Sequence, residues 1–228
     1  MKNIAIIPAR GGSKRIPRKN IKLFFDKPII AYSIETALNT GLFDEVMVST
    51  DDQEIVAIAK QYGASVPFMR SEAMSDDYAT IVDVLNEVLE TYKECGYVFD
   101  NMCCILATSP LITVEQLRDA YYKLIFSEDL TTIYPIVPFS YSIFRSLKMD
   151  ENGYVRMNWP EYAKTRSQDL EVMYHDAGSF YWHKVDKWNS DRLIKGGIVV
   201  DEITVQDVDT EIDWRLAELK YRLLYGNE

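Results

Sequence analysis

Short apolar runs alternate with longer amphipathic segments over the first 130 residues, and this alternation constrains the fold more than any other feature. The apolar runs are typical of buried strands, and the amphipathic segments have helical spacing. Alternation of this kind predicts a three-layer, doubly wound, mostly parallel α/β sheet, because parallel strands need crossover helices. The expected strands are 3–9, 45–50, 65–68 and 102–107, and the expected helices are 28–41, 51–63, 79–94 and 113–126.

Capping residues mark several of the expected helix boundaries. Pro28 lies in the first turn of one helix and Gly41 follows its end, which is the usual distribution of these residues. Acidic residues open the next helix and Gly63 follows it, as the helix dipole and C-terminal capping favour. Thr113 and Gln116 have the spacing of a capping box. These signals support the helix assignments.

The pattern changes after residue 138. The segment 139–157 alternates in polarity and contains Asn-Gly, a hairpin signal. Ten aromatic residues lie between 139 and 185, more than a small segment outside the core buries alone. We therefore expect a single domain over 1–228, with an inserted antiparallel and aromatic excursion at 139–185 that forms a homodimer interface. Strands at 197–200 and 203–205 and a helix at 209–224 are expected to return the chain to the main sheet.

Charge and composition exclude several classes of function. The net charge of -10 argues against a nucleic-acid partner, and no apolar stretch approaches the 18 residues of a membrane span. The N-terminal apolar run is too short for a signal peptide. Cys95, Cys103 and Cys104 are odd in number and match no zinc spacing. These features predict a reduced, cytoplasmic protein without a membrane partner.

A basic loop follows the first strand, at the edge where α/β sheets bind ligands. Six of the 25 basic residues lie between positions 10 and 22 of this acidic chain. Gly11 and Gly12 permit close approach of backbone amides to phosphate oxygens, and Ser13 adds a hydroxyl. The spacing matches neither a Walker A loop nor a dinucleotide fingerprint. We interpret the loop as a triphosphate site, the alternative being a solvated basic loop.

Two polar segments near the C-terminus carry further candidate residues. Asp207 and Asp209 alternate, so both carboxylates can face one side and bind magnesium. The alternative is that Asp209 or Thr210 caps the last helix. Arg166 lies in a polar group within the aromatic region and is suited to pairing with the carboxylate of an acidic sugar. Polar residues near it are Gln168 and Asp169, while His175 and His183 are interpreted as structural.

The segment IIPARGGSKRIPRKNIK closely resembles the N-terminal signature of the acylneuraminate cytidylyltransferases, the CMP-sialic acid synthetase family. The resemblance extends along the chain and implies a Rossmann-like nucleotidyltransferase fold, Mg2+ as cofactor, and CTP and an acidic nine-carbon sugar as substrates. Further matching segments are KPIIAYSIETAL, VSTDDQEI, RSEAMSDDYAT (with Ser71 in place of a proline), ATSPL and QDVDTEID.

The resemblance also implies roles for individual residues, while no general base is identified. The nucleotide-binding residues would be Ala9, Arg10, Gly11, Gly12, Ser13, Lys14, Asn20, Arg70 and Ser75. Catalysis would rest on Arg10, Lys14 and Lys19, and magnesium on Asp207 and Asp209. The sugar-binding residues would be Leu106, Thr108, Arg166, Gln168 and Tyr174.

Two departures from the sialic acid pattern point to one branch of the family. Sialic acid activators typically have glutamine where this chain has Leu106, and Asn-Gly where this chain has YHDAGSFYW (174–182). Both features resemble the branch of the family that activates pseudaminic acid. A leucine at this position would also suit a deoxygenated sugar that carries a methyl group. The alternatives are activation of sialic, legionaminic or KDO sugars, or a non-catalytic nucleotide-binding regulatory domain. Simple binding would not require both the basic loop and the carboxylate pair.

Overall fold

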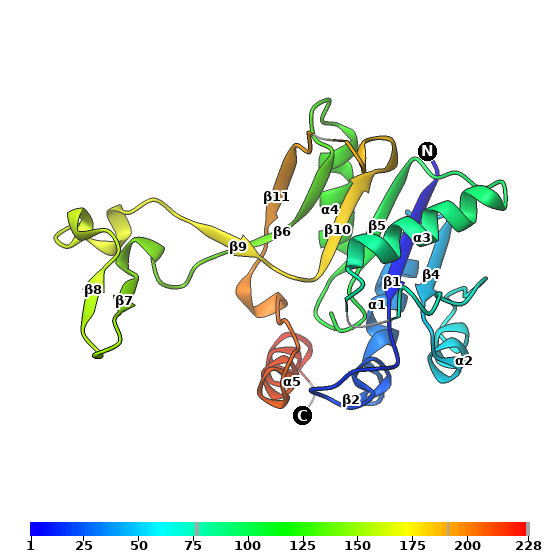
Figure 1. The fold of residues 1–228 in the computed structure, drawn as a ribbon, viewed down its shortest axis with the longest axis horizontal. Helices are drawn as coiled ribbons and strands as arrows, with labels where there is room; N and C mark the ends of the chain where they lie inside the picture. Colours follow the sequence, from blue (N-terminus) through cyan, green and yellow to red (C-terminus); the bar gives the residue numbers. More distant parts are fainter. Residues whose placement is uncertain (76–77, 191, 227–228) are drawn as a thin grey trace.

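The structure is a computed structural model that describes residues 1–75, 78–190 and 192–226. Within these residues, a seven-stranded sheet has the order β11-β6-β10-β5-β1-β4, with β9 paired to β6 (Figure 1). The strands are β1 (Asn3–Pro8), β4 (Glu45–Ser49), β5 (Asn101–Ile105), β6 (Thr132–Pro138), β9 (Tyr174–Asp176), β10 (Phe180–Lys184) and β11 (Lys195–Val199).

The sheet is mostly parallel, as the sequence predicts. β1 pairs in parallel with β4 and β5, and β6 pairs in parallel with β11. β10 lies antiparallel between β5 and β6, and β9 is antiparallel to β6. The carboxyl ends of β1, β4 and β5 therefore meet at one edge, where the loops after these strands come together.

Helices cover both faces of the sheet, which gives the predicted three layers (Figure 1). Ala5 and Ile7 of β1 pack in a core cluster with α1, α2 and α4, whereas Ile4 and Ile6 pack with α3. This split follows from the alternation of side chains along a strand. The helices are α1 (Ile29–Thr40), α2 (Gln53–Gln61), α3 (Ile81–Glu94), α4 (Val114–Ile125) and α5 (Glu211–Tyr225).

α5 packs beneath the loop that follows β1. Its Trp214 is buried in a cluster with Ile16 and Phe24 of that loop region. Thr210 caps α5, and the predicted Thr113–Gln116 capping box of α4 is confirmed. Two-residue strands β2 (Leu23–Phe24) and β3 (Lys27–Pro28) close the loop, and 3-10 helices lie at Lys19–Ile21 (η1), Ile143–Arg145 (η2), Pro160–Tyr162 (η3), Ser167–Asp169 (η4), Val185–Lys187 (η5) and Glu202–Thr204 (η6).

Residues 139–173 project from the sheet, and we call them the arm (Figure 1). The predicted Asn-Gly hairpin is confirmed as β7 (Leu147–Met149) paired with β8 (Val155–Met157). The rest of the predicted 139–185 excursion is in the central sheet, because β9 and β10 pair with β6 and β5. The buried aromatic side chains of β10 belong to the core rather than to an excursion.

Other sequence predictions differ from the structure locally. The predicted strand 65–68 is reduced to a single bridge between Ser65 and Met47, and the predicted strand 203–205 is largely the 3-10 helix η6. β6 was not expected, because its Pro135 and Pro138 weaken the strand signal. None of the described helices has the length and apolar character needed to cross a membrane.

Candidate active site

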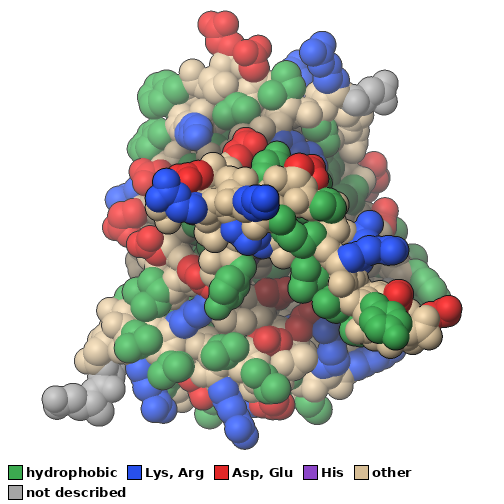
Figure 2. Space-filling view, turned by 90° about the vertical axis from the view of Figure 1, so that its left-hand side faces the viewer, with side chains coloured by type: hydrophobic (Ala, Val, Ile, Leu, Met, Phe, Trp, Pro, Cys, Tyr) green, Lys and Arg blue, Asp and Glu red, His purple; other side chains and the backbone are tan. Residues whose placement is uncertain are grey.

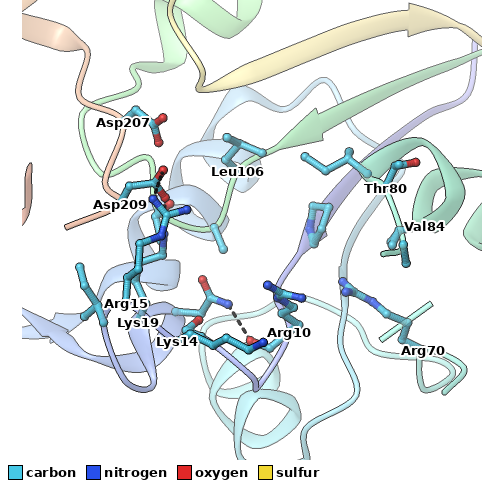
Figure 3. A pocket seen from close by; sticks show the side chains of 18 of the residues that line it. Arg10, Lys14, Arg15, Lys19, Arg70, Thr80, Val84, Leu106, Asp207 and Asp209 are labelled. Carbon is cyan, nitrogen blue, oxygen red and sulfur yellow. Dashed lines mark hydrogen bonds and ion pairs between the residues drawn. The ribbon is translucent and has the colours of Figure 1, made fainter. Parts of the chain in front are cut away.

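A pocket of about 570 Å³ opens at the carboxyl ends of β1 and β5 (Figure 3). Its walls come from the loop after β1, the region around Arg70, the start of α3, the loop after β5 and the segment before α5. Residues predicted for three different roles are thus brought together. Those that line the pocket are Arg10, Ser13, Lys14, Lys19, Asn20, Arg70, Leu106, Thr108, Asp207 and Asp209.

The backbone of the basic loop is fixed by contacts with the end of β4 and the start of α2. The Ala9 amide donates to the Ser49 carbonyl at 2.9 Å, and the Gly11 amide donates to Asp51 Oδ1 at 2.9 Å. A Cβ at Gly11 would lie 2.6 Å from Asp52 Oδ2, whereas one at Gly12 would meet nothing within 4 Å. The predicted nucleotide-binding residues Ala9, Gly11 and Gly12 are not among the residues lining the pocket.

An ion-pair cluster holds the far end of the same loop. Arg18 has left-handed backbone angles (φ 55°, ψ 30°) and pairs with both Asp52 and Glu54. Asp52 also caps α2, since its side chain accepts from the amides of Glu54 and Ile55. The hydrogen bond from Arg18 holds the pKa of Asp52 down at about 2. Asn20 completes the loop by donating to the Arg10 carbonyl at 2.9 Å.

The two carboxylates predicted to bind metal lie beside this loop. Val208 between them is fully buried, and the side chains on either side of it, Asp207 and Asp209, line the pocket. The segment that carries them is not a strand. Asp209 pairs with Arg15 at 2.9 Å and with Lys19 at 3.4 Å. Desolvation, followed by repulsion from Asp209, raises the pKa of Asp207. The N-cap of α5 is Thr210, whose hydroxyl accepts a hydrogen bond from the Asp213 amide. Asp209 is therefore not the capping residue.

Arg70 forms the opposite wall, where Figure 3 shows it near Arg10 and across from the aspartates. Its guanidinium is buried and donates to the Ser49 hydroxyl at 3.1 Å and to the Ser49 carbonyl. Burial lowers the pKa of Arg70. Ser75 does not line the pocket, and its hydroxyl donates to the Ser71 carbonyl at 2.7 Å.

The loop after β5 supplies the apolar part of the pocket. Leu106 and Thr108 are half-buried and line it, and the Leu106 amide donates to the Ser179 carbonyl at 2.9 Å. Thr80, Ile81 and other residues at the start of α3 also line the pocket but were not predicted. A capping box formed by Thr80 marks this helix start, and its spacing is readable in the sequence.

Three predicted sugar-binding residues are not among those lining this pocket. Arg166 is the N-cap residue of η4 in the arm and Gln168 lies within η4. Both side chains are exposed, and Arg166 pairs with Asp169 at 3.2 Å. Tyr174 begins β9 and is 44% exposed. The arm, which carries Arg166 and Gln168, projects from the sheet (Figure 1), and none of the three residues is in the lining of the pocket.

The sequence of the chain is similar to those of known cytidylyltransferases. Residues 4–178 match the profile of the cytidylyltransferase family. The chain is 43% identical to pseudaminic acid cytidylyltransferase of Campylobacter jejuni, over 98% of this chain and 97% of the relative. It is 39% identical to a Helicobacter pylori protein named pseudaminic acid cytidylyltransferase and UDP-2,4-diacetamido-2,4,6-trideoxy-β-L-altropyranose hydrolase, over 91% of this chain and 40% of the relative.

A solved structure supports the fold independently of close sequence similarity. CMP:2-keto-3-deoxy-manno-octonic acid synthetase complexed with CTP matches with a TM-score of 0.71 and 17% identity, over 100% of both chains. Together with the sequence matches, the basic loop and the carboxylate pair, this shows that the chain belongs to the cytidylyltransferase family.

Proposed function

We propose that this chain transfers CMP from CTP to the anomeric oxygen of pseudaminic acid and releases pyrophosphate. One observation carries the proposal: a single pocket is lined both by the cations Arg10 and Lys14 and by the carboxylates Asp207 and Asp209 (Figure 3). A similar protein, 43% identical over nearly the whole chain, is a pseudaminic acid cytidylyltransferase. A regulatory nucleotide-binding domain would not need both charge clusters.

In the proposed reaction, the anomeric hydroxyl loses its proton to solvent and its oxygen attacks the α-phosphorus of CTP. The bond from that phosphorus to the bridging oxygen breaks, and the bridging oxygen leaves with pyrophosphate. Arg10 and Lys14 would bind the triphosphate and stabilise charge that develops on it, with Ser13 donating a further hydrogen bond. The rigid loop favours this role, because preorganised donors stabilise a transition state without reorganising first.

We also propose that Asp207 and Asp209 hold Mg2+ together with the CTP phosphates. Among the described residues, no group of three or more His, Cys, Asp or Glu could hold a metal ion. A pair nevertheless fits magnesium, which takes one or two carboxylates and completes its shell with water and phosphate oxygens. Bound there, the ion would neutralise phosphate charge. Arg15 and Lys19, which pair with Asp209, would then turn toward the phosphates.

The fused Helicobacter pylori relative informs the chemistry of the sugar. Its second activity acts on a hexose with two acetamido groups and a deoxygenated sixth carbon. Activities joined in one chain commonly act on connected substrates, so we infer that the acid sugar keeps both acetamido groups and a terminal methyl. Leu106 offers such a sugar apolar surface, and an unpaired buried hydroxyl on a rival sugar costs about 1–3 kcal/mol.

The arm is proposed to form a homodimer interface in the cytoplasm, where free cysteines persist. It exposes large hydrophobic side chains, including Tyr141 at 89%, Met149 at 73% and Tyr154 at 74%. Figure 2, in which the arm faces the viewer, shows hydrophobic side chains among charged ones on this face. Arg166 and Gln168 would contact sugar only if the dimer brings them to a pocket.

Pyrophosphate release tests the proposed function. The purified protein is incubated with CTP, magnesium and, in turn, pseudaminic, legionaminic, N-acetylneuraminic and KDO acids. We expect turnover with pseudaminic acid and a kcat/KM about a hundredfold lower for N-acetylneuraminic acid. Release with none of these acids would contradict the enzyme assignment, and preference for another acid would contradict the sugar assignment alone.

Leu106→Gln tests the residue inferred to select the sugar. We expect it to erode the preference for pseudaminic acid, chiefly by raising the KM for that sugar, because an amide replaces apolar surface. The KM for CTP serves as the internal control. A preference that stays at its wild-type value in this variant would show that Leu106 does not select the sugar.

A further inference from the structure

A second pocket, of about 330 Å³, adjoins the proposed active site. Ile81 lines both pockets. Leu106 lines the first and packs in the same cluster as Tyr181 and Trp188, which line the second. The two pockets therefore adjoin at Ile81, at the start of α3.

The carboxylate pair is also close to this second pocket. A Cβ at Gly178 would lie 4.0 Å from the Cβ of Asp207, and the Gly178 amide donates to Asp176 Oδ1 at 2.8 Å. Asp176 lines the second pocket and Asp207 lines the first. A substrate whose reacting oxygen lies at Asp207 thus has the second pocket within reach of its other substituents.

Most of the second pocket is apolar. Val82 and Leu85 come from α3, while Trp188 and Leu193 come from the chain between β10 and β11. His183 adds an uncharged ring. Burial, and to a smaller extent the positive charge of Lys195, lower the pKa of His183 to about 4. Nδ1 of His183 forms a hydrogen bond of 2.9 Å with the Thr132 hydroxyl. This part of the pocket suits a small apolar group.

Polar side chains also line the pocket, among them Asp176, Tyr181, Tyr134 and Lys195. The Asp176 carboxylate accepts from the Tyr181 hydroxyl at 3.1 Å through Oδ1. Within the described residues, neither the Lys195 ammonium nor the Tyr134 hydroxyl has a hydrogen-bond partner. The pocket therefore combines a carboxylate acceptor with two available donors.

We propose that the second pocket receives an N-acyl group of the acid sugar while the anomeric oxygen lies in the first. An acyl amide has an N–H for a carboxylate, a carbonyl for an ammonium or hydroxyl, and a methyl for apolar walls, which is the combination that lines this pocket. The inference rests on the proposed function, since it assumes that the substrate is an N-acylated acid sugar.

Filling the pocket tests the assignment. Val82 is 47% exposed and lines only the second of the two pockets described, so Val82→Trp should narrow it without disturbing the core. We expect the KM for pseudaminic acid to rise about tenfold, with the KM for CTP and the Tm unchanged. Val98→Trp, at a position 65% exposed and outside the pocket lining, is the matched control.

A second variant and a second substrate separate acyl recognition from general damage. Lys195→Met keeps the length of the side chain and removes the ammonium, so it should raise the KM for pseudaminic acid several-fold. Wild-type enzyme should prefer pseudaminic acid to its de-N-acetylated analogue. Val82→Trp should reduce that preference, because the acyl group loses its pocket.

The outcomes distinguish this inference from the function on which it rests. Turnover of pseudaminic acid by the wild type tests the function first. Given that turnover, an unchanged sugar KM in both Val82→Trp and Lys195→Met would overturn the acyl pocket and leave the function intact. A changed oligomeric state with an unchanged sugar KM would also overturn it, because the pocket would then belong to a protein interface.

Discussion

The loop at residues 9–22 and the arm at 139–173 both carry predicted ligand residues outside the sheet, but they are held differently. The loop is tied to distant parts of the chain: Arg18 pairs with Asp52 of the α2 cap, and Lys22 pairs with Glu211 of α5. In the arm, Arg166 pairs with Asp169 on its own turn. Long-range contacts fix the geometry of the loop within one chain, whereas the local pair of Arg166 does not tie this side chain to the pocket.

The largest effect is expected for the cations of the loop. Lys14→Ala and Arg10→Ala should each lower kcat/KM by about a hundredfold or more, because each removes a charge-assisted contact that strengthens in the transition state. The Tm should change little, since Lys14 is exposed. Lys148→Ala, at an exposed position in the arm, is the control of equal charge. Near-normal turnover in both loop variants would remove the phosphate-site assignment.

Asp207→Asn should separate activity from stability. Because the pKa of Asp207 is raised, the fold disfavours its charged form. The amide should therefore raise the Tm of the metal-free protein at pH 8. At a pH below about 3.9 this gain should vanish, because the carboxyl is then protonated in both folded and unfolded states. Magnesium-dependent turnover should fall about a hundredfold, since amides bind the ion more weakly.

Asp209→Asn is the matched control for this variant. It loses charged partners in Arg15 and Lys19, so its Tm should fall while its magnesium requirement rises in the same way. If the magnesium titration of both variants matched that of the wild type, the carboxylate pair would have a structural role and the proposed metal site would be wrong.

Replacing each of the two glycines of the loop by alanine should have smaller effects on kcat/KM, and the effects should differ between Gly11 and Gly12. A Cβ at Gly11 would lie 2.6 Å from Asp52 Oδ2, so Gly11→Ala should displace the loop and lower kcat/KM about tenfold. The expected loss of stability is about 1–3 kcal/mol. Gly12→Ala has open space around its Cβ and keeps the backbone amide, so it should resemble the wild type. Equal effects in both variants would contradict the contact between the loop and α2.

Sequence reasoning succeeded where general rules of parallel sheets apply. The loops after β1 and β5 meet because parallel strands end at one edge, and Arg10 and Leu106 therefore line one pocket. β6 was missed because of its prolines, and β10 because its aromatic residues resembled those of the arm. Thr80 lines the pocket because of the way α3 packs against the loops. This packing involves distant parts of the chain, so no local sequence pattern predicts it.

The smallest expected effect is on stability, when one arginine of the loop and one arginine of the arm are each replaced by alanine. Arg18→Ala breaks pairs with Asp52 and Glu54 from different elements, and it should lower stability by about 1 kcal/mol. That loss corresponds to a Tm decrease of about 2–4 °C in a chain of this size. Arg166→Ala breaks an exposed pair within one turn, and such pairs contribute little, so its Tm should not move measurably.

Kinetics then decide whether the arm acts through a partner. If a homodimer brings Arg166 to the sugar, Arg166→Ala should raise the KM for pseudaminic acid several-fold and leave the KM for CTP unchanged, since a guanidinium pairs strongly with a carboxylate. Light scattering should show a dimer for the wild type and for this variant. A monomeric wild type with full activity would show that Arg166 does not act through a partner subunit, since a monomer has only its own pocket, whose lining lacks Arg166.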